Sequence, residues 1–224
     1  MEIIIHVVNT RRRQFSNYCY LVEEVESRKA ILIDPSWNEA VFEKIIKEQG
    51  VKLEAVLLTH SHVDHTNLAN YFAVTFDVPV FISQIEVVSY NFQCNNLQCI
   101  FDGNILNLAN IPIRCILTAG HTRGSMSYLI GENLFVGDTI FYEGCGKCTY
   151  GEESINQMYN SIQKIIAIGT DKYRIYSGHV YNKMVGQALG NIKRDNICFL
   201  FNKHQFMAYM MNQLEKDIFS TKQL

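Results

Sequence analysis

The chain has 224 residues, of which 48% are hydrophobic and 19% are charged, a composition typical of a soluble globular enzyme rather than a disordered chain. Its formal net charge of −2 lacks the basic surplus of nucleic-acid-binding proteins, so we expect no nucleic-acid partner. No apolar run approaches the roughly 20 residues that cross a bilayer, so we expect no membrane partner either.

The amino-terminal stretch and the cysteines indicate a cytoplasmic protein. The stretch MEIIIHVVNTRRRQ has no basic segment before an apolar one and therefore does not resemble a secretory signal. The seven cysteines are an odd number spread along a sizeable chain, which favours reduced thiols. We expect a cytoplasmic location.

Strands alternate with helices in the first half of the chain. The β-branched and aromatic segments MEIIIHVV, NYCYLVEE and KAILIDP predict strands. Apolar spacing predicts a helix over residues 37–49, which Gly50 ends. The next predicted elements are, in order, a strand at 53–58, a helix at 64–76, a strand at 79–82 and a helix at 84–92.

The second half continues the alternation. Strands are predicted at 111–117, 127–130, 134–136 and 173–176. Ser154 is expected to cap a helix over 154–168, and the chain should be mostly helical from about residue 185. Without a Gly/Ser-rich linker, we expect one α/β domain over residues 1–224.

The segment HSHVDH places three histidines and an aspartate in six residues, directly after a predicted strand. Residues two apart on an extended segment point the same way, so His60 and His62 can converge on one metal ion. Asp64 and His65, at the turn into a helix, can face a second position. Because polar groups need partners once they are buried, the cluster predicts a metal site.

Three later residues follow predicted strands, each beside a glycine: His121, Asp138 and His179. Any one of them alone would more often be an ordinary structural residue. Together with the HSHVDH cluster they form a set of histidines and aspartates that suits zinc, iron or manganese.

HSHVDH, AGHTRGS, VGDT and SGH, in this order, resemble the metallo-β-lactamase superfamily, and GDTIFYEGCGK resembles its glyoxalase II branch. The resemblance implies an αβ/βα sandwich, with two mixed sheets face to face and helices outside. It also implies two metal ions per chain, zinc being expected and iron or manganese possible. One ion would be held by His60, His62 and His121, and the other by Asp64, His65 and His179. Asp138 would bridge them, and we take Asp64 and Asp138 as candidate catalytic residues.

The expected reaction is hydrolysis of a thioester. The sequence offers no obvious general acid, and an amide nitrogen would need a proton in order to leave. The thiol released from a thioester has a pKa of about 8.5, so it can leave as a thiolate without first being protonated. A small acyl thioester therefore fits this site with fewer assumptions than an amide.

Several segments depart from glyoxalase II, among them Thr66-Asn67-Leu68, the DPSW turn and Cys148-Thr149. RRRQFSNY, IDPSW, HSHVDHTNL and EGCGKC instead resemble the zinc-dependent hydrolases found with trans-acyltransferase polyketide synthases. That resemblance implies a substrate acyl group on the phosphopantetheine of an acyl carrier protein, in antibiotic-type polyketide biosynthesis. The alternatives are a hydroxyacylglutathione hydrolase and, further away, a mononuclear iron persulfide dioxygenase.

Four basic residues are candidates for binding such a substrate. Arg11, Arg13 and Lys147, together with Arg12, would suit an acidic carrier protein and a phosphate, and Lys147 also matches a glutathione-contacting lysine of the resembling branch. Taken alone, the arginine cluster is more often a solvated loop than a phosphate-binding site. The sequence leaves the oligomeric state open.

Two further features have more than one interpretation. Asp34 and Thr59 are candidates to orient ligand imidazoles, although Asp34 could equally be a turn residue. Cys145 and Cys148 form a CxxC pattern that would suit a redox pair, or a zinc site together with Cys94 and Cys99. Because the context differs from both, we expect thiols of a loop near the mouth of the site.

Overall fold

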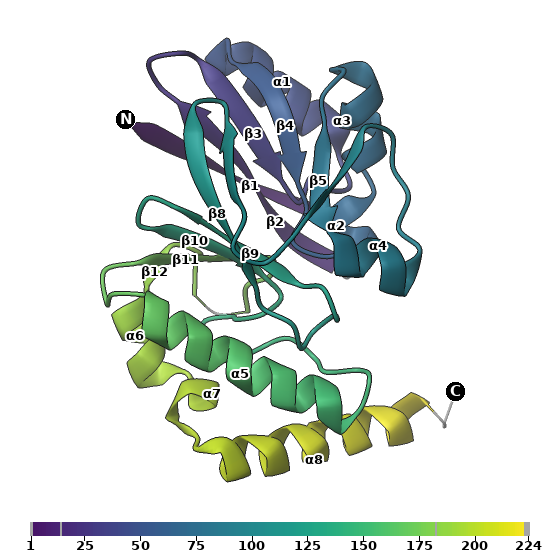
Figure 1. Ribbon diagram of the computed structural model, residues 1–224, viewed down its shortest axis with the longest axis vertical. Coiled ribbons are helices and arrows are strands. Elements are labelled where there is room, and N and C mark those ends of the chain that lie inside the picture. The colour runs from purple at the N-terminus through teal and green to yellow at the C-terminus, as the bar shows by residue number, and fades with distance from the viewer. Residues whose placement is uncertain (1, 14, 182, 222–224) are drawn as a thin grey trace.

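Two six-stranded sheets pack face to face, with helices on both outer sides, in a computed structural model that describes residues 2–13, 15–181 and 183–221 (Figure 1). The first sheet contains, in spatial order, β1 (Ile3–Arg12), β2 (Phe15–Glu24), β3 (Lys29–Ile33), β4 (Lys52–Leu57), β5 (Val80–Ser83) and β6 (Leu97–Ile100). Its strands are antiparallel from β1 to β3 and parallel from β3 to β6. The sheet is therefore mixed, as expected.

The second sheet is mixed as well. It contains β7 (Ile105–Leu108), β8 (Ile111–Leu117), β9 (Met126–Ile130), β10 (Asn133–Gly137), β11 (Arg174–Ser177) and β12 (Gln187–Ala188). Its only parallel pair among the described residues is β10 with β11. The predicted αβ/βα sandwich is confirmed.

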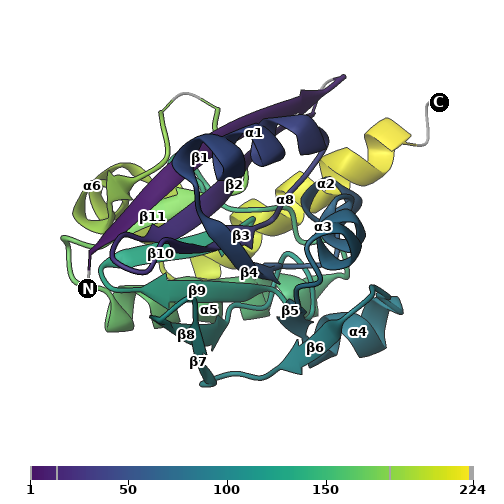
Figure 2. The ribbon, with the colours of Figure 1, turned by 90° about the horizontal axis from the view of Figure 1, so that it is seen from above.

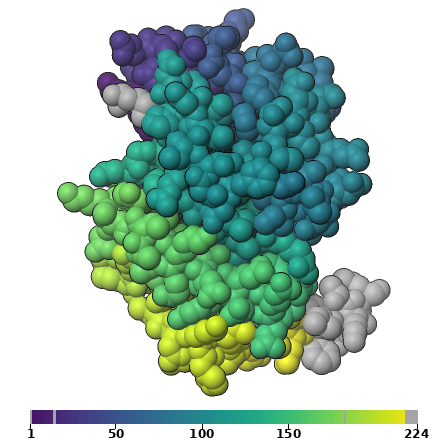
Figure 3. Space-filling model, viewed as in Figure 1, coloured from purple at the N-terminus to yellow at the C-terminus, as the bar shows by residue number. Residues whose placement is uncertain are grey.

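The helices form two outer layers (Figure 2). The first sheet is accompanied by α1 (Glu39–Gln49), α2 (Val63–Thr66), α3 (Ala69–Thr75) and α4 (Gln84–Tyr90). The second is covered by α5 (Glu152–Ile168), α6 (Leu189–Asp195), α7 (Ile197–Leu200) and α8 (Lys203–Thr221). Helices α5 and α8 make up much of the lower end of the face in Figure 3.

Alternating side chains along the strands build three apolar layers. In β2, Leu21 packs toward α1 and α3, whereas Tyr20 and Val22 pack between the sheets. This alternation follows from the two-residue period of a strand. On the far side of the second sheet, Leu134 and Val136 pack against α5 and α8. Both faces of each sheet are thus buried, which holds the strand ends in fixed positions.

Three local predictions differ from the structure. The helix predicted at 64–76 is two helices, because Asn67 ends the first one and its side-chain oxygen accepts from the Trp37 backbone N–H at 2.9 Å. Helix α5 begins at Glu152 after Gly151; Ser154 is not its cap, and its hydroxyl donates to the Gly151 carbonyl instead. Strands β6 and β7 are only four residues long and were not predicted.

The segment after residue 185 forms β12 and then α6, α7 and α8. Among the described residues, no helix is both long and apolar enough to cross a membrane.

Candidate metal centre

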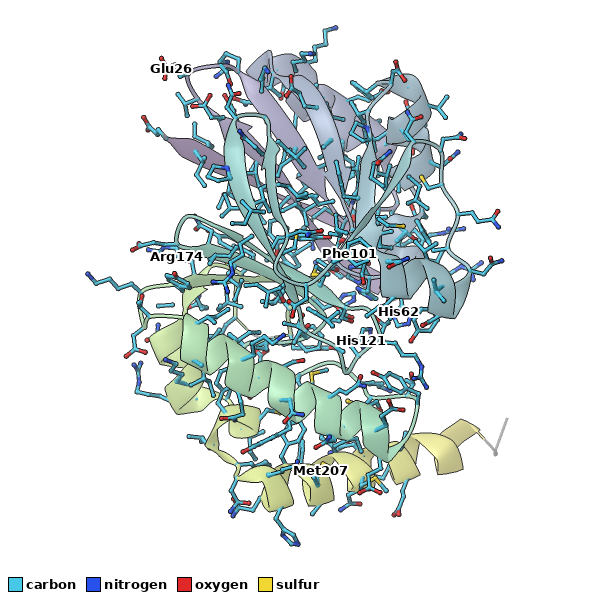
Figure 4. The ribbon with its side chains drawn as sticks, viewed as in Figure 1. Glu26, His62, Phe101, His121, Arg174 and Met207 are labelled. Atoms are coloured by element: carbon cyan, nitrogen blue, oxygen red, sulfur yellow. The ribbon has the colours of Figure 1, made fainter. Side chains whose placement is uncertain are left out.

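Four strands from both sheets end at one place. The residues that follow β4, β8, β10 and β11 include every metal ligand that the sequence predicts. The labelled side chains of His62 and His121 lie close together there, where the second sheet meets its helices and α4 (Figure 4). Bonds across the sheets fix this corner: the Tyr128 hydroxyl donates to the Leu58 carbonyl, and the Met126 N–H donates to the Thr59 carbonyl at 2.8 Å.

The first donor set is His60, His62 and His121. The Nδ1 atom of His62 lies 3.1 Å from His60 Nε2 and 2.9 Å from His121 Nε2. The three ring nitrogens therefore converge on one point. His60 is 1% exposed and His121 is 7% exposed, so this point is shielded from bulk water.

The second donor set is Asp64, His65 and His179. The Oδ2 atom of Asp64 lies 3.3 Å from His179 Nε2 and 3.7 Å from His65 Nε2. Tetrahedral metal sites commonly take imidazole and carboxylate ligands of this kind.

Asp138 lies between the two sets. Its Oδ1 atom is 3.5 Å from His65 Nε2, and its Oδ2 atom is 3.6 Å from His121 Nε2 and 3.4 Å from His179 Nε2. One carboxylate thus faces nitrogen atoms of both sets, which is the position expected of a bridging ligand.

Two buried atoms in this cluster lack a hydrogen-bond partner in the structure: His65 Nε2 and Asp138 Oδ1. Buried polar atoms rarely lack a partner, because no hydrogen bond then offsets the free energy lost on removing them from water. Both atoms belong to groups that bind metal ions, and they point at one another across 3.5 Å. The residues present therefore fit a metal ion.

In the first donor set the charge states suit metal binding too. Burial lowers the pKa of His62 to about 4, and it holds the pKa of His60 well below its usual range. Both rings are thus neutral at pH 7 and offer a lone pair. Burial would raise the pKa of Asp138, but the charges of His65 and His179 hold it well below its usual range, so the carboxylate is ionised.

A second layer of hydrogen bonds orients the ligands. Asp34 accepts from the Thr59 N–H at 2.7 Å and from the Thr59 hydroxyl at 2.6 Å, and its Oδ2 atom lies 3.0 Å from His65 Nδ1. Thr59 Oγ1 lies 3.0 Å from His60 Nδ1. Asp34 thus contacts an imidazole of the second set, and Thr59 contacts one of the first set. This agrees with the interpretation that these two residues orient candidate ligands.

Backbone carbonyls hold the remaining rings. His121 Nδ1 lies 2.9 Å from the Lys147 carbonyl, and His179 Nδ1 lies 2.8 Å from the Ser16 carbonyl. Such contacts fix the tautomer of a ligand so that Nε2 is free to bind. Gly178 permits the close packing, because a Cβ atom there would overlap His65 and Asp138.

Sequence reasoning missed two polar residues at this corner. Asn17, 1% exposed, donates to Asp64 Oδ2 at 3.1 Å and accepts from the Trp37 indole N–H at 2.7 Å. Glu86, fully buried, accepts from two backbone N–H groups beside ligands. Asn17 lies within the resembling segment RRRQFSNY but was not singled out there, and the only sequence signal for Glu86 is a carboxylate among the apolar residues of a helix.

The predicted substrate-binding arginines lie at the surface beside the site. Arg11 is exposed and donates to the Asn9 side chain, and Arg13 is exposed at the turn after β1. Arg12 instead lies over the Trp37 ring, with its guanidinium carbon 5.1 Å from the ring centroid. Lys147 is exposed, and its backbone carbonyl contacts His121 Nδ1.

The cysteines are not arranged as a CxxC redox pair or as a zinc site. The sulfur of Cys145 lies 3.5 Å from that of Cys198, and Cys148 is buried, which raises the pKa of its thiol to about 12. Cys94 contacts Asn70 beside the other sheet. In the described part of the chain, the groups suited to a metal contain histidine and aspartate only.

Comparison with known proteins assigns this geometry to a family. A model described as the metallo-β-lactamase superfamily matches residues 12–92. A "Probable polyketide biosynthesis zinc-dependent hydrolase PksB" from Bacillus subtilis is 37% identical over 219 residues, which cover 97% of this chain and 97% of the relative. The chain belongs to the metallo-β-lactamase superfamily.

Other metallo-β-lactamase superfamily relatives are more distant in sequence. The "Hydroxyacylglutathione hydrolase, cytoplasmic isozyme" of Saccharomyces cerevisiae is 31% identical over 210 residues, 86% of this chain and 77% of that protein. The crystal structure of ETHE1 from Myxococcus xanthus superposes with a TM-score of 0.81 at 25% identity and covers 93% of this chain and 91% of that one. The relatives named as hydrolases support a hydrolase role, and the ETHE1 structure supports the fold.

Proposed function

We propose that this hydrolase cleaves thioesters, and that its substrates are acyl groups held on the phosphopantetheine of an acyl carrier protein. One observation of the structure carries the hydrolytic part: Asp138 faces two complete donor sets at once. The substrate part is supported by the relative named for polyketide biosynthesis, which matches nearly the full length of the chain.

The two donor sets would hold two zinc ions, with Asp138 between them. Zinc ions in such a site polarise a carbonyl and lower the pKa of water so that it attacks at neutral pH. The chain itself orients the donors through hydrogen bonds to the ligand side chains. These bonds come from Asp34, Asn17 and the backbone carbonyls of Lys147 and Ser16. Iron or manganese would suit the same ligands.

The thioester proposal follows from the leaving group. A thiolate, with the pKa of its thiol near about 8.5, departs without a proton, so the site needs no general acid beside the ligands. An amide would need one.

Basic and aromatic side chains supply a proposed contact surface for the carrier protein. Arg12 lies on the Trp37 ring, and the indole N–H of Trp37 bonds Asn17, which in turn bonds Asp64. Arg11, Arg13 and Lys147 are exposed and would add positive charge. Carrier proteins are acidic and the phosphopantetheine arm carries a phosphate, so the charges are complementary.

The test is intact-mass spectrometry of an acylated carrier protein before and after incubation with the zinc-loaded hydrolase. We expect loss of the acyl group to be faster than hydrolysis of lactoylglutathione under matched conditions. Faster turnover of lactoylglutathione would instead make the chain a hydroxyacylglutathione hydrolase, and oxygen consumption with a persulfide would make it a dioxygenase.

A variant with Arg11, Arg12 and Arg13 all changed to Ala tests the contact surface. We expect a higher KM for the acylated carrier protein and little change for a small acyl thioester, because only the carrier is acidic. Equal effects on both substrates would contradict the proposed role of the arginines.

A further inference from the structure

Glu86 is a buried carboxylate between the two loops that carry the first donor set. It lies in the first turn of α4 and is fully buried. Its Oε2 atom accepts from the Ser61 N–H at 2.7 Å, and its Oε1 atom accepts from the Gly124 N–H at 2.8 Å. Each carboxylate oxygen thus has one backbone partner, and the two partners belong to different loops.

These two loops come from different sheets. Ser61 stands between His60 and His62, after β4 of the first sheet. Gly124 stands three residues after His121, on the loop between β8 and β9 of the second sheet. The first donor set therefore depends on the spacing between two loops that share no strand pairing.

Helix α4 holds the second loop through another bond too. The Tyr90 hydroxyl accepts from the Arg123 N–H at 3.0 Å. Gly124 leaves the room that Glu86 needs, because a Cβ atom there would lie 2.6 Å from the Glu86 nitrogen and 2.9 Å from its Oε1. A glycine at residue 124 is thus needed for the Glu86 carboxylate to reach the backbone of this loop.

We infer that Glu86 is a positioning residue that sets the separation of His60 and His62 from His121. The inference rests on the proposed metal-binding role of these histidines. The second donor set should not depend on Glu86, because other groups orient it: Asn17 bonds Asp64, Asp34 faces His65, and the Ser16 carbonyl faces His179. Loss of the Glu86 contacts should weaken one set and spare the other.

Glu86→Gln is the most informative variant, since the side chain keeps its size. An amide has one carbonyl oxygen, and its NH₂ group would face a backbone donor, so one of the two loops loses its bond. Changes to groups that orient metal ligands typically cost about 10- to 100-fold in metal affinity. We expect a loss of this size at the first donor set.

The measurement is zinc affinity by competition with a chromophoric chelator, in two backgrounds that isolate the sets. In a His179→Ala background the first set is intact, and Glu86→Gln should weaken zinc binding there by about 10-fold or more. In a His121→Ala background the second set is intact, and the same change should alter affinity less than about 3-fold. Equal loss in both backgrounds, or none in either, would overturn the inference.

Glu24→Gln is a matched control. Glu24 is also a buried carboxylate that accepts from backbone N–H groups, those of Glu26 and Ser27. Glu26 lies at the upper end of the molecule, away from His62 and His121 near its middle (Figure 4). Glu24→Gln should leave zinc affinity unchanged, and a loss equal to that of Glu86→Gln would mean that the effect is only a general loosening of the fold.

Gly124→Ala approaches the same contact from its other side. The added methyl group would displace Glu86 and should weaken the first donor set as Glu86→Gln does; normal zinc affinity in this variant would count against the inference.

The unmodified chain separates this inference from the proposed function. If it binds no zinc, the metal role fails; if it binds two ions and Glu86→Gln binds them equally well, only the positioning role fails.

Discussion

Replacing Asp138 with Asn is expected to lower kcat/KM for an acyl thioester on the order of a thousandfold, equivalent to about 4 kcal/mol. Asp138 is 8% exposed, and its two oxygens face His65, His121 and His179 from both donor sets. An amide is neutral and has a single oxygen, so it cannot serve both sets. The measurement is steady-state hydrolysis together with the zinc content of the purified variant.

Asp171→Asn is the matched control. Asp171 is exposed and pairs with Lys193 on the surface, so the same chemical change should leave hydrolysis within about twofold. Retention of more than a tenth of the activity in Asp138→Asn would contradict a bridging role for that carboxylate.

Replacing Asp34 with Asn is expected to weaken zinc binding by about 10- to 100-fold. Asp34 is 3% exposed and contacts Thr59 and His65 through both oxygens. Its backbone is left-handed, with φ at 50°, a conformation that Asn tolerates, so the variant tests the side chain rather than the turn.

The Asp34→Asn variant should also lose stability. Its amide NH₂ would face a donor, and a buried donor without an acceptor costs about 1–3 kcal/mol. Urea unfolding of the metal-free chain measures this cost, and chelator competition measures zinc affinity. Normal zinc affinity in a destabilised variant would show that Asp34 is only a structural residue of its turn.

The sequence predicts which side chains gather at the candidate site, because strand ends carry them. Spacing within HSHVDH and a glycine beside each later residue are local signals, and the resemblance orders them along the chain. The structure brings all seven side chains to one corner. The alternation of apolar strands such as β4 with amphipathic helices such as α1 predicts an α/β fold, and the family resemblance adds the sandwich.

The supporting residues were harder to predict because their contacts are distant in sequence. Asn17 bonds Asp64, 47 residues away, and Glu86 bonds Gly124, 38 residues away. A single asparagine or glutamate in a strand or helix is usually solvated, and nothing local distinguishes these two. The break between α2 and α3 was missed similarly, because it depends on the contact between Asn67 and the Trp37 backbone.

The basic cluster shows a different limit. Three consecutive arginines gave no indication of which side chain packs on a neighbouring residue, and in the structure Arg12 lies over the Trp37 ring. Successive side chains on β1 point to opposite faces of the sheet, so the register of β1 against β2 determines which arginine contacts Trp37. The position of the turn after β1 depends on the same pairing.

The number of metal ions bound per chain tests the central claim most directly. The purified chain is saturated with zinc, excess metal is removed by gel filtration, and zinc and protein are quantified by elemental analysis and absorbance. We predict two zinc ions per chain, falling to one in His179→Ala. A single ion per chain in the unmodified protein, or none, would contradict the two-metal hydrolytic centre.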